Sequence, residues 1–251
     1  MSIALITGGS RGLGKSMAEH LAKRGVDSII TYNTDKESAD RVVVEIEAKG
    51  RKAVAFKLDA TKHQTFEAFA TKVKSTLSSQ WGRSDFDYLV NNAGMGMEHL
   101  MIAETPSEVF DEMVNTHLKA PFFLTQSLLP LIKDGGRIVN ISSGLTRFSY
   151  PGYAAYAMVK GGIEVFTRYL AAELGPRRIA VNTLAPGAIE TDFGGGRVRN
   201  NPQLQDMIAK GTALGRVGQA DDIGGAVAAL LADESGWING QRIEASGGVH
   251  L

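Results

Sequence analysis

The sequence contains no cysteine and no excess of charge of either sign. Among its 251 residues the Cys count is 0, which excludes disulfide frameworks and cysteine-ligated metal sites. Lys+Arg and Asp+Glu each count 27, so the formal net charge is +0. A balanced charge gives no overall attraction to nucleic acid or to an anionic membrane, and neither is expected as a partner.

Long hydrophobic runs are also absent. The first ten residues, MSIALITGGS, hold an apolar run shorter than the roughly 7–15 residues of a signal-peptide core. No run approaches the ~20 apolar residues of a membrane-spanning helix. With 43% hydrophobic and 22% charged residues, the composition is that of an ordinary globular protein. We therefore expect a cytoplasmic location.

Short apolar runs alternate with helical segments along the whole chain. The candidate strands cover residues 2–7, 28–32, 52–58, 86–92, 136–142, 179–185 and 242–245. The candidate helices cover residues 12–24, 35–49, 62–80, 106–131, 153–174 and 219–233. Such alternation is typical of right-handed βαβ units. It predicts an α/β fold, a single doubly wound Rossmann-type domain over residues 1–251 with a mainly parallel seven-stranded sheet.

A glycine-rich turn follows the first candidate strand. Residues 7–16 have the sequence TGGSRGLGKS and open a helix, whose free amides can hold a pyrophosphate. Met17 stands where the dinucleotide pattern G-x-G-x-x-G needs its third glycine. The same segment matches the Walker A pattern in full, with Lys15 and Ser16 in the phosphate and magnesium roles, and Asp59 after an apolar run as a weak magnesium ligand. The turn alone leaves dinucleotide binding and a P-loop NTPase open.

Further motifs follow in order. NNAG at 91–94 ends the fourth candidate strand, Ser143 follows the fifth, and Tyr156 and Lys160 form Y-x-x-x-K, thirteen residues beyond Ser143. Together with the T-G-x-x-x-G-x-G turn, they resemble the short-chain dehydrogenase/reductase family over essentially the whole chain, above all its bacterial carrier-protein ketoreductase-like members. The resemblance implies an NAD(P)-dependent oxidoreductase that interconverts a carbonyl and a secondary alcohol by hydride transfer. A non-catalytic NADP(H)-binding sensor or scaffold is the main alternative, and the P-loop NTPase becomes a remote one.

Tyr156 and Lys160 carry the expected chemistry. Four residues apart on a helix, they share a face with Cβ atoms about 5–6 Å apart. Lowering a Tyr pKa from about 10 to near neutrality requires about 4 kcal/mol of preferential phenolate stabilisation, which the ammonium and an oxidised nicotinamide are expected to supply. The resemblance implies that Tyr156 exchanges the substrate proton and that Lys160 also binds the nicotinamide ribose. It further implies that Ser143 hydrogen-bonds the reacting oxygen and that Asn115 holds a water which relays protons to Lys160.

Neighbouring side chains offer alternatives to this assignment. Ser142 could take the place of Ser143, which the thirteen-residue spacing favours. Tyr153 is a weaker candidate base than Tyr156, because the residue four positions on is Ala157, which carries no charge. Metal chemistry is not expected, because the histidines lack metal-site spacing. These histidines are His20, His63, His99, His117 and His250.

The resemblance also implies a cofactor site along the ends of the strands. Its residues are Gly8, Ser10, Arg11, Gly12, Leu13, Gly14, Asn33, Asp59, Asn91, Ala93, Gly94, Tyr156, Lys160, Pro186, Gly187, Ile189 and Thr191. NAD specificity normally uses a carboxylate at the end of the second strand, where residues 32–34 carry none. Arg11 can instead form a bidentate pair with a 2′-phosphate. NADP(H) is therefore expected, and NAD(H) stays open because Asp35 lies nearby; Asp59 has a helix cap as its alternative role.

A small-molecule carbonyl or alcohol is the expected substrate. A partly apolar set of side chains follows the strand ends: Leu145, Phe148, Tyr150, Tyr153, Ala188 and Phe193. Residues 188–218 include three successive glycines in TDFGGGRVRN and little periodicity, which predicts a mobile loop that closes over the substrate. The resemblance also implies a homotetramer, or a homodimer, formed by the helices near 106–131 and 153–174 and by the C-terminal strand segment.

Overall fold

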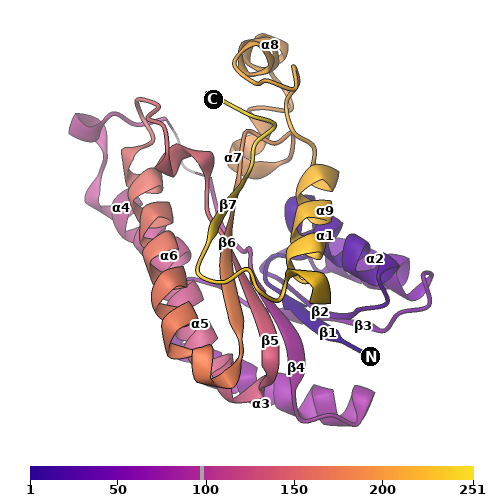
Figure 1. Ribbon diagram of the computed structural model, residues 1–251. Coiled ribbons are helices and arrows are strands. Elements are labelled where there is room, and N and C mark those ends of the chain that lie inside the picture. The colour runs from indigo at the N-terminus through magenta and orange to yellow at the C-terminus, as the bar shows by residue number, and fades with distance from the viewer. Residues whose placement is uncertain (97–98) are drawn as a thin grey trace.

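A parallel sheet forms the centre of the molecule (Figure 1). The computed structural model describes residues 1–96 and 99–251, and in these the strands have the order β3-β2-β1-β4-β5-β6-β7. The strands are β1 Ile3–Ile6, β2 Asp27–Tyr32, β3 Ala53–Lys57, β4 Phe86–Asn91, β5 Ile132–Ile141, β6 Ala180–Pro186 and β7 Arg242–Ala245. Each pairing is parallel. The strand order reverses between β1 and β4, where doubly wound sheets bind their ligands.

Helices cover both faces of the sheet (Figure 1). On one face lie α1 Gly12–Lys23, α2 Lys36–Glu47 and α9 Ala220–Leu230. On the other lie α3 Phe66–Thr76, α4 Ser107–Val114, α5 Ala120–Leu128 and α6 Ala154–Glu173. Strand β1 is buried on both sides, with Ile3 and Leu5 in one core cluster and Ala4 and Ile6 in the other. This double burial explains why the strands are short continuous apolar runs, and the predicted doubly wound seven-stranded fold is confirmed.

The helix expected over 106–131 is interrupted. Between α4 and α5 lies a π-helical turn, Asn115–Lys119, in which the N–H of Ala120 donates to the carbonyl of Asn115. Pro121 has no N–H for the carbonyl four residues before it and would clash with that carbonyl in a regular α-helix. The wider turn relieves this conflict. It also changes which side chains of the segment face α6.

The segment 188–218 contains more regular structure than its composition indicated. A short turn of helix, α7 Phe193–Gly196, is followed by α8 Pro202–Lys210. The side chain of Asn201 accepts a hydrogen bond from the N–H of Leu204 at 3.0 Å, and Pro202 occupies the first helical turn. The glycines obscured this helix start in the sequence. In the described part of the chain, no helix combines the length and apolar character needed to cross a membrane.

Candidate active site

The glycine turn brings β1 and α1 into close contact at the carboxyl edge of the sheet. Gly8 has φ +66°, which glycine adopts without strain, and its N–H donates to Thr31 Oγ1 at 3.1 Å. A Cβ at Gly14 would lie 2.2 Å from the carbonyl oxygen of Gly8, so no larger residue fits there. Because α1 begins at Gly12, its first amides have no partner within the helix. Such a turn can cradle a phosphate or pyrophosphate.

Asn92 braces this turn from β4. Its Nδ2 donates to the carbonyl oxygens of Thr7 and Gly8 at 2.8 and 3.2 Å. Thr7 Oγ1 in turn accepts from the N–H groups of Asn92 and Ala93, both at 2.9 Å. Sequence reasoning selected Asn91 of the same motif and missed this role of its neighbour. The side chain of Asn91 lies inside the core, where its Nδ2 donates to Asn140 Oδ1 at 2.8 Å.

The positions of the Walker A side chains do not match those in a P-loop. Lys15 Nζ pairs with Glu45 Oε2 on α2 at 2.8 Å. Ser16 is buried against α9, where a Cβ on Gly224 would lie 2.3 Å from Ser16 Oγ. Neither side chain takes the place that a triphosphate and its magnesium ion require. The geometry therefore favours dinucleotide binding over the P-loop interpretation.

Near the end of β2, the carboxylate of Asp35 already accepts hydrogen bonds within the protein. The strand ends at Tyr32, and Asp35 caps α2 by accepting from Ser38 Oγ at 2.6 Å and from the N–H of Ser38 at 2.9 Å. These two hydrogen bonds lower the pKa of Asp35, with a smaller contribution from the positive charge of Arg11. Arg11 is exposed, with extended backbone, directly before α1. Asn33, which follows β2 directly, is thus two residues before a carboxylate that serves as a helix cap.

Asp59, beyond β3, is also hydrogen-bonded locally. Its Oδ1 accepts from Thr61 Oγ1 at 2.7 Å and from the N–H of Thr61 at 3.0 Å. The side-chain hydrogen bond is the main cause of a lowered pKa at Asp59, against an opposing effect of burial. The carboxylate thus fixes the turn that leads toward α3. The alternative role of Asp59 as a helix cap is wrong, because Thr65 occupies the N-cap position of α3.

The segment after β6 reaches across to the glycine turn. The N–H of Gly187, just past Pro186, donates to the carbonyl of Ala245 at 3.1 Å, and Ile189 forms a bridge with Gly218. The Thr191 side chain lies so close to the turn that a Cβ on Gly12 would be 3.8 Å from its Cβ. The segment after β6 and the turn after β1 are thus in contact at the carboxyl edge of the sheet. The remaining residues of the expected cofactor site lie along this edge: Ser10 and Leu13 at the start of α1, and Ala93 and Gly94 after β4.

The catalytic candidates converge beside this edge. Ser143 follows β5 and caps a short 3₁₀ helix, Gly144–Thr146, by accepting from the N–H of Leu145 at 3.2 Å. Tyr156 and Lys160 lie on α6, and Lys160 Nζ is 5.6 Å from the centre of the Tyr156 ring. Lys160 Nζ also donates to the carbonyl of Ile141, the last residue of β5, at 2.9 Å. The end of one strand and one face of one helix therefore bring the three side chains together.

Burial dominates the titration of this pair. Protein atoms surround the Tyr156 hydroxyl and raise its pKa, while a hydrogen bond with Ser143 acts in the opposite direction. Burial lowers the pKa of Lys160 to about 7. The expected acidification of Tyr156 by Lys160 is thus not achieved by these side chains alone, because the removal of both groups from water outweighs their attraction. An oxidised nicotinamide, if bound beside Tyr156, would add a positive charge that favours the phenolate.

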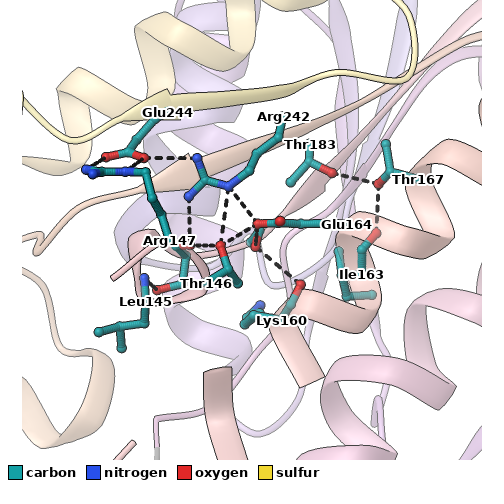
Figure 2. A network of polar contacts seen from close by, with 12 residues as sticks. Leu145, Thr146, Arg147, Lys160, Ile163, Glu164, Thr167, Thr183, Arg242 and Glu244 are labelled. Carbon is teal, nitrogen blue, oxygen red and sulfur yellow. Dashed lines mark hydrogen bonds and ion pairs between the residues drawn. The ribbon is translucent and has the colours of Figure 1, made fainter. Parts of the chain in front are cut away.

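A polar network fixes the loop that carries Ser143 (Figure 2). Glu164, one turn beyond Lys160 on α6, accepts from Ser142 Oγ at 2.7 Å and from Arg242 Nε at 2.8 Å through the same oxygen. Arg242 also donates to the carbonyl of Ser143 at 3.3 Å. The Ser142 hydroxyl is therefore engaged in the network, which leaves the hydroxyl of Ser143 as the one beside Tyr156.

The C-terminal strand extends this network. Arg147 forms a two-point ion pair with Glu244 on β7, with both N···O distances at 2.7 Å (Figure 2). Hydrogen bonding from Arg147 lowers the pKa of Glu244 to about 2, despite the opposing effect of burial. Arg147 also donates to the carbonyl of His250 at 2.9 Å. The end of the chain thus supports the loop after β5.

Five aromatic side chains form two sets of ring contacts, Tyr156 with Phe193 and Tyr153 with His99 and Tyr150. We call His99, Tyr150, Tyr153, Tyr156 and Phe193 the aromatic cluster. The Tyr156 and Phe193 ring centres are 6.1 Å apart, those of Tyr153 and His99 5.7 Å, and those of Tyr150 and Tyr153 6.5 Å. Arg197, after α7, donates to the Tyr153 hydroxyl at 2.8 Å. Of the other side chains expected here, Phe148 packs on His250 at 4.8 Å, Leu145 lies in the 3₁₀ helix after Ser143, and Ala188 pairs through its backbone with Gly218.

His117 is a member of the site that sequence reasoning considered only as a metal ligand. It lies in the π-helical turn, is 2% exposed, and packs edge-on against Tyr156 with ring centres 5.3 Å apart. Burial is the main cause that holds its pKa well below the ordinary value. The charge of Lys160 adds to this effect, and a hydrogen bond to the carbonyl of Met95 partly offsets it. Asn115 begins the same turn, and its side chain forms no hydrogen bond with residues 1–96 or 99–251.

Comparison with known proteins gives consistent relatives. Residues 8–250 match the family model described as enoyl-(acyl carrier protein) reductase. The chain is 37% identical to the tetrahydroxynaphthalene reductase PfmaG of Pestalotiopsis fici, over 98% of this chain and 90% of the relative. It is 35% identical to 3-oxoacyl-[acyl-carrier-protein] reductase FabG of Staphylococcus aureus, over 99% and 98%. The angucycline C-6 ketoreductase LanV, solved with bound NADP, has a TM-score of 0.93 at 35% identity, with 99% of this chain and 95% of that chain covered.

Proposed function

Because the chain belongs to the short-chain dehydrogenase/reductase family, and is therefore an oxidoreductase that interconverts a carbonyl and an alcohol, we propose a specific reaction for it. This reaction is the NADP(H)-dependent reduction of a ketone on a fused-ring aromatic substrate, with Tyr156 as the proton donor. The observation that carries the proposal is the position of Tyr156, which is in contact with Lys160, with Ser143 and with the ring of Phe193.

The residues at the carboxyl edge fit a dinucleotide. The first amides of α1 have no partner within the helix and can hold a pyrophosphate, and the Thr191 segment lies beside this turn. Lys160, on the same helix as Tyr156, would hold the nicotinamide ribose. The reduced cofactor supplies the hydride when it is bound. Ser143 hydrogen-bonds the substrate oxygen and stabilises the negative charge that develops there. Tyr156 gives its proton to that oxygen, and Lys160 stabilises the resulting phenolate.

The preference for NADP(H) is supported by the end of β2. Arg11 is exposed at the start of α1, and the nearest carboxylate, Asp35, accepts two hydrogen bonds from Ser38. A 2′-phosphate there meets a guanidinium and no free carboxylate. The relatives agree, because LanV and a short-chain dehydrogenase from Burkholderia cenocepacia were both solved with NADP.

The substrate class is supported by the aromatic cluster. Rings prefer edge-to-face and offset contacts with other rings, so this cluster favours a planar aromatic ketone over a sugar. PfmaG and LanV are named for reductions of naphthalene and angucycline compounds. FabG is named for an acyl thioester, which makes that class the competing outcome. An intact set of Ser143, Tyr156 and Lys160 disfavours a cofactor sensor without turnover, since binding alone does not require a proton donor.

Assembly into a homotetramer or homodimer and a cytoplasmic location remain parts of the proposal. Helices α5 and α6 expose large apolar side chains that a second copy could cover, namely Phe122, Met158, Val165 and Tyr169. The mass in solution, measured by light scattering, tests the assembly. A mass equal to one chain would contradict it.

A substrate panel tests the reaction itself. Loss of absorbance of the reduced coenzyme is followed with fused-ring aromatic ketones, acyl thioesters and sugars, each with NADPH and with NADH, and ATP with Mg²⁺ serves as a control for phosphate release. We expect the highest kcat/KM for an aromatic ketone with NADPH. Higher values for an acyl thioester or a sugar contradict the substrate class, and higher values with NADH contradict the cofactor. Cofactor binding without any turnover contradicts catalysis.

A further inference from the structure

We propose that His117 is a positioning residue of this active site, which fixes the ring of Tyr156 and keeps a neutral, hydrogen-bond-accepting nitrogen beside the Tyr156–Lys160 pair. The inference rests on the proposed function, because Tyr156 matters only if it transfers a proton. It goes beyond that function by adding a residue to the site. The argument uses the contacts of His117, the tautomer that they require and the backbone that places it.

The contacts hold the imidazole in one orientation. His117 Nε2 lies 2.8 Å from the carbonyl oxygen of Met95, and a Cβ on Gly94 would lie 2.8 Å from His117 Cε1. His117 also contacts Tyr156, with the two ring planes at 88° to each other. The imidazole is thus enclosed between the segment after β4 and helix α6. A ring held in this way limits how far the Tyr156 ring can turn.

The Met95 carbonyl determines the tautomer. A carbonyl oxygen only accepts, so Nε2 must carry a hydrogen; the longer 3.5 Å contact from the N–H of Met95 to the same nitrogen is the weaker one. In the neutral imidazole Nδ1 then bears a lone pair. This Nδ1 is buried and has no hydrogen-bond partner in the described part of the chain. Buried polar atoms are normally paired, and those left unpaired often mark functional sites.

The π-helical turn places His117 here. Thr116 and His117 are buried, while Lys119 at the end of the turn is exposed to solvent. The turn packs on α6, which carries Tyr156 and Lys160. Extra residues in such turns often redirect side chains at functional sites. The sequence analysis expected Asn115, in the same turn, to act on Lys160. The structure instead shows His117 of this turn in contact with Tyr156.

The electrostatic consequence follows from the neutral state. Among the described residues, the titratable side chain that packs on the Tyr156–Lys160 pair from the π-helical turn is His117. β5 contributes the carbonyl of Ile141, and Glu164 is paired with Arg242. An imidazole lone pair near Lys160 favours its ammonium form, whereas an imidazolium would repel it. His117 therefore supports the charge that Lys160 needs in order to stabilise a tyrosine phenolate.

Substitution at one position separates packing from the nitrogen. His117→Phe keeps an aromatic ring without Nδ1, His117→Gln keeps a hydrogen-bonding group without the ring, and Lys119→Ala is the matched control on the exposed end of the same turn. For His117→Phe we expect kcat to fall at least about tenfold, with the KM for NADPH within about twofold. The alkaline limit of the reduction rate should move up by about half a pH unit or more, because the phenolate is less stabilised. His117→Gln should recover part of kcat.

Three results would overturn the proposal. One is a His117→Phe variant with the kcat and pH profile of the wild type. Another is equal loss in the Phe and Gln variants together with a lowered melting temperature, which indicates packing alone. The third is independent of turnover: nitrogen NMR of the wild-type protein should show a neutral imidazole with its hydrogen on Nε2 at a pH below the ordinary histidine pKa of about 6.5, and an imidazolium there contradicts the proposal. If the wild-type enzyme reduces no ketone while the NMR result holds, the proposed function fails and the geometry of His117 does not.

Discussion

Buried charged groups have more hydrogen-bond partners at the amino end of the strands than at the carboxyl end. At the amino end, Asp27 begins β2 and is 0% exposed, yet it accepts from Trp81 Nε1 at 2.8 Å and from the N–H of Lys52 at 3.0 Å. Nearby, Asp87 accepts from the N–H of Ile3 at 2.8 Å and from Arg83 Nη1 at 2.7 Å. Both carboxylates at this end have hydrogen-bond donors that compensate for lost water.

At the carboxyl end the compensation is incomplete. Lys160 is 5% exposed, and the partner of its ammonium is one backbone carbonyl, that of Ile141. Burial lowers its pKa to about 7, and His117 leaves a nitrogen unpaired beside it in the described structure. The comparison teaches that one fold can hold its strands together with paired charges at one edge and keep underpaired, titratable charges for chemistry at the other.

The largest expected effect is on the chemistry of the carboxyl end. Tyr156→Phe removes the hydroxyl and keeps the ring, so we expect reduction with NADPH to fall at least about a thousandfold. Binding of NADPH, measured by calorimetry, should stay within about twofold, because the ring contacts persist. Surviving turnover above a few per cent would mean that another group donates the proton.

The next largest effect is a loss of stability when a paired carboxylate at the amino end is removed. Asp27→Ala leaves the indole N–H of Trp81 and the N–H of Lys52 without acceptors, so the free energy of unfolding should fall by about 2–4 kcal/mol. Activity at low temperature should persist, since the site lies at the other edge. Urea unfolding measures the loss, and Trp81→Phe is the matched control.

In the Asp27→Ala background, Trp81→Phe should cost less than it does alone, because the two side chains share one hydrogen bond. Fully additive losses would show that the bond contributes nothing. If Asp27→Ala also loses activity at low temperature, where it is still folded, the two edges of the sheet do not have separate roles.

Most of the fold was predictable because its signals are local. Parallel strands buried on both faces are short apolar runs, and the turn at 7–16 and the Y-x-x-x-K spacing carry their chemistry within a few residues. The π-helical turn was missed, because it depends on Pro121 together with packing on α6. Helix α8 was missed because three glycines precede it.

Parts of the site were hidden for a different reason. Glu164 and Arg242 are 78 residues apart, so no local pattern connects them to the loop of Ser143. Which of Asn91 and Asn92 reaches the glycine turn depends on where β4 ends, and a one-residue difference reverses the side chain. His117 is a lone histidine, and only its burial against Tyr156 distinguishes it from the other four.

A smaller effect tests whether the ion pair between Glu164 and Arg242 is needed for catalysis at the carboxyl end. Glu164→Gln keeps the size of the side chain and weakens its hold on Arg242 and Ser142, so the loop of Ser143 should become less well positioned. We expect kcat to fall about tenfold, with the KM for NADPH little changed. Arg168→Gln, on the exposed side of α6, is the control. An unchanged kcat would show that the network is structural only.

The smallest effect concerns stability and reverses the usual direction. Between about pH 7 and 10.5 the unfolded chain holds a proton on Lys160 that the folded chain has lost, so wild-type stability contributed by this residue rises with pH. Lys160→Met should therefore be inactive yet more stable than the wild type at pH 6.5, by about 1–2 kcal/mol after loss of the bond to Ile141.

The gain of Lys160→Met should shrink as the pH rises toward 10, because the folded wild type then holds Lys160 neutral and no longer buries a charge. Urea unfolding at the two pH values measures the gain, with Lys119→Met as an exposed control. A Met variant that is less stable at pH 6.5 would show that the carbonyl of Ile141 compensates the buried ammonium as fully as Trp81 and Lys52 compensate Asp27. The two ends of the sheet would then follow one rule.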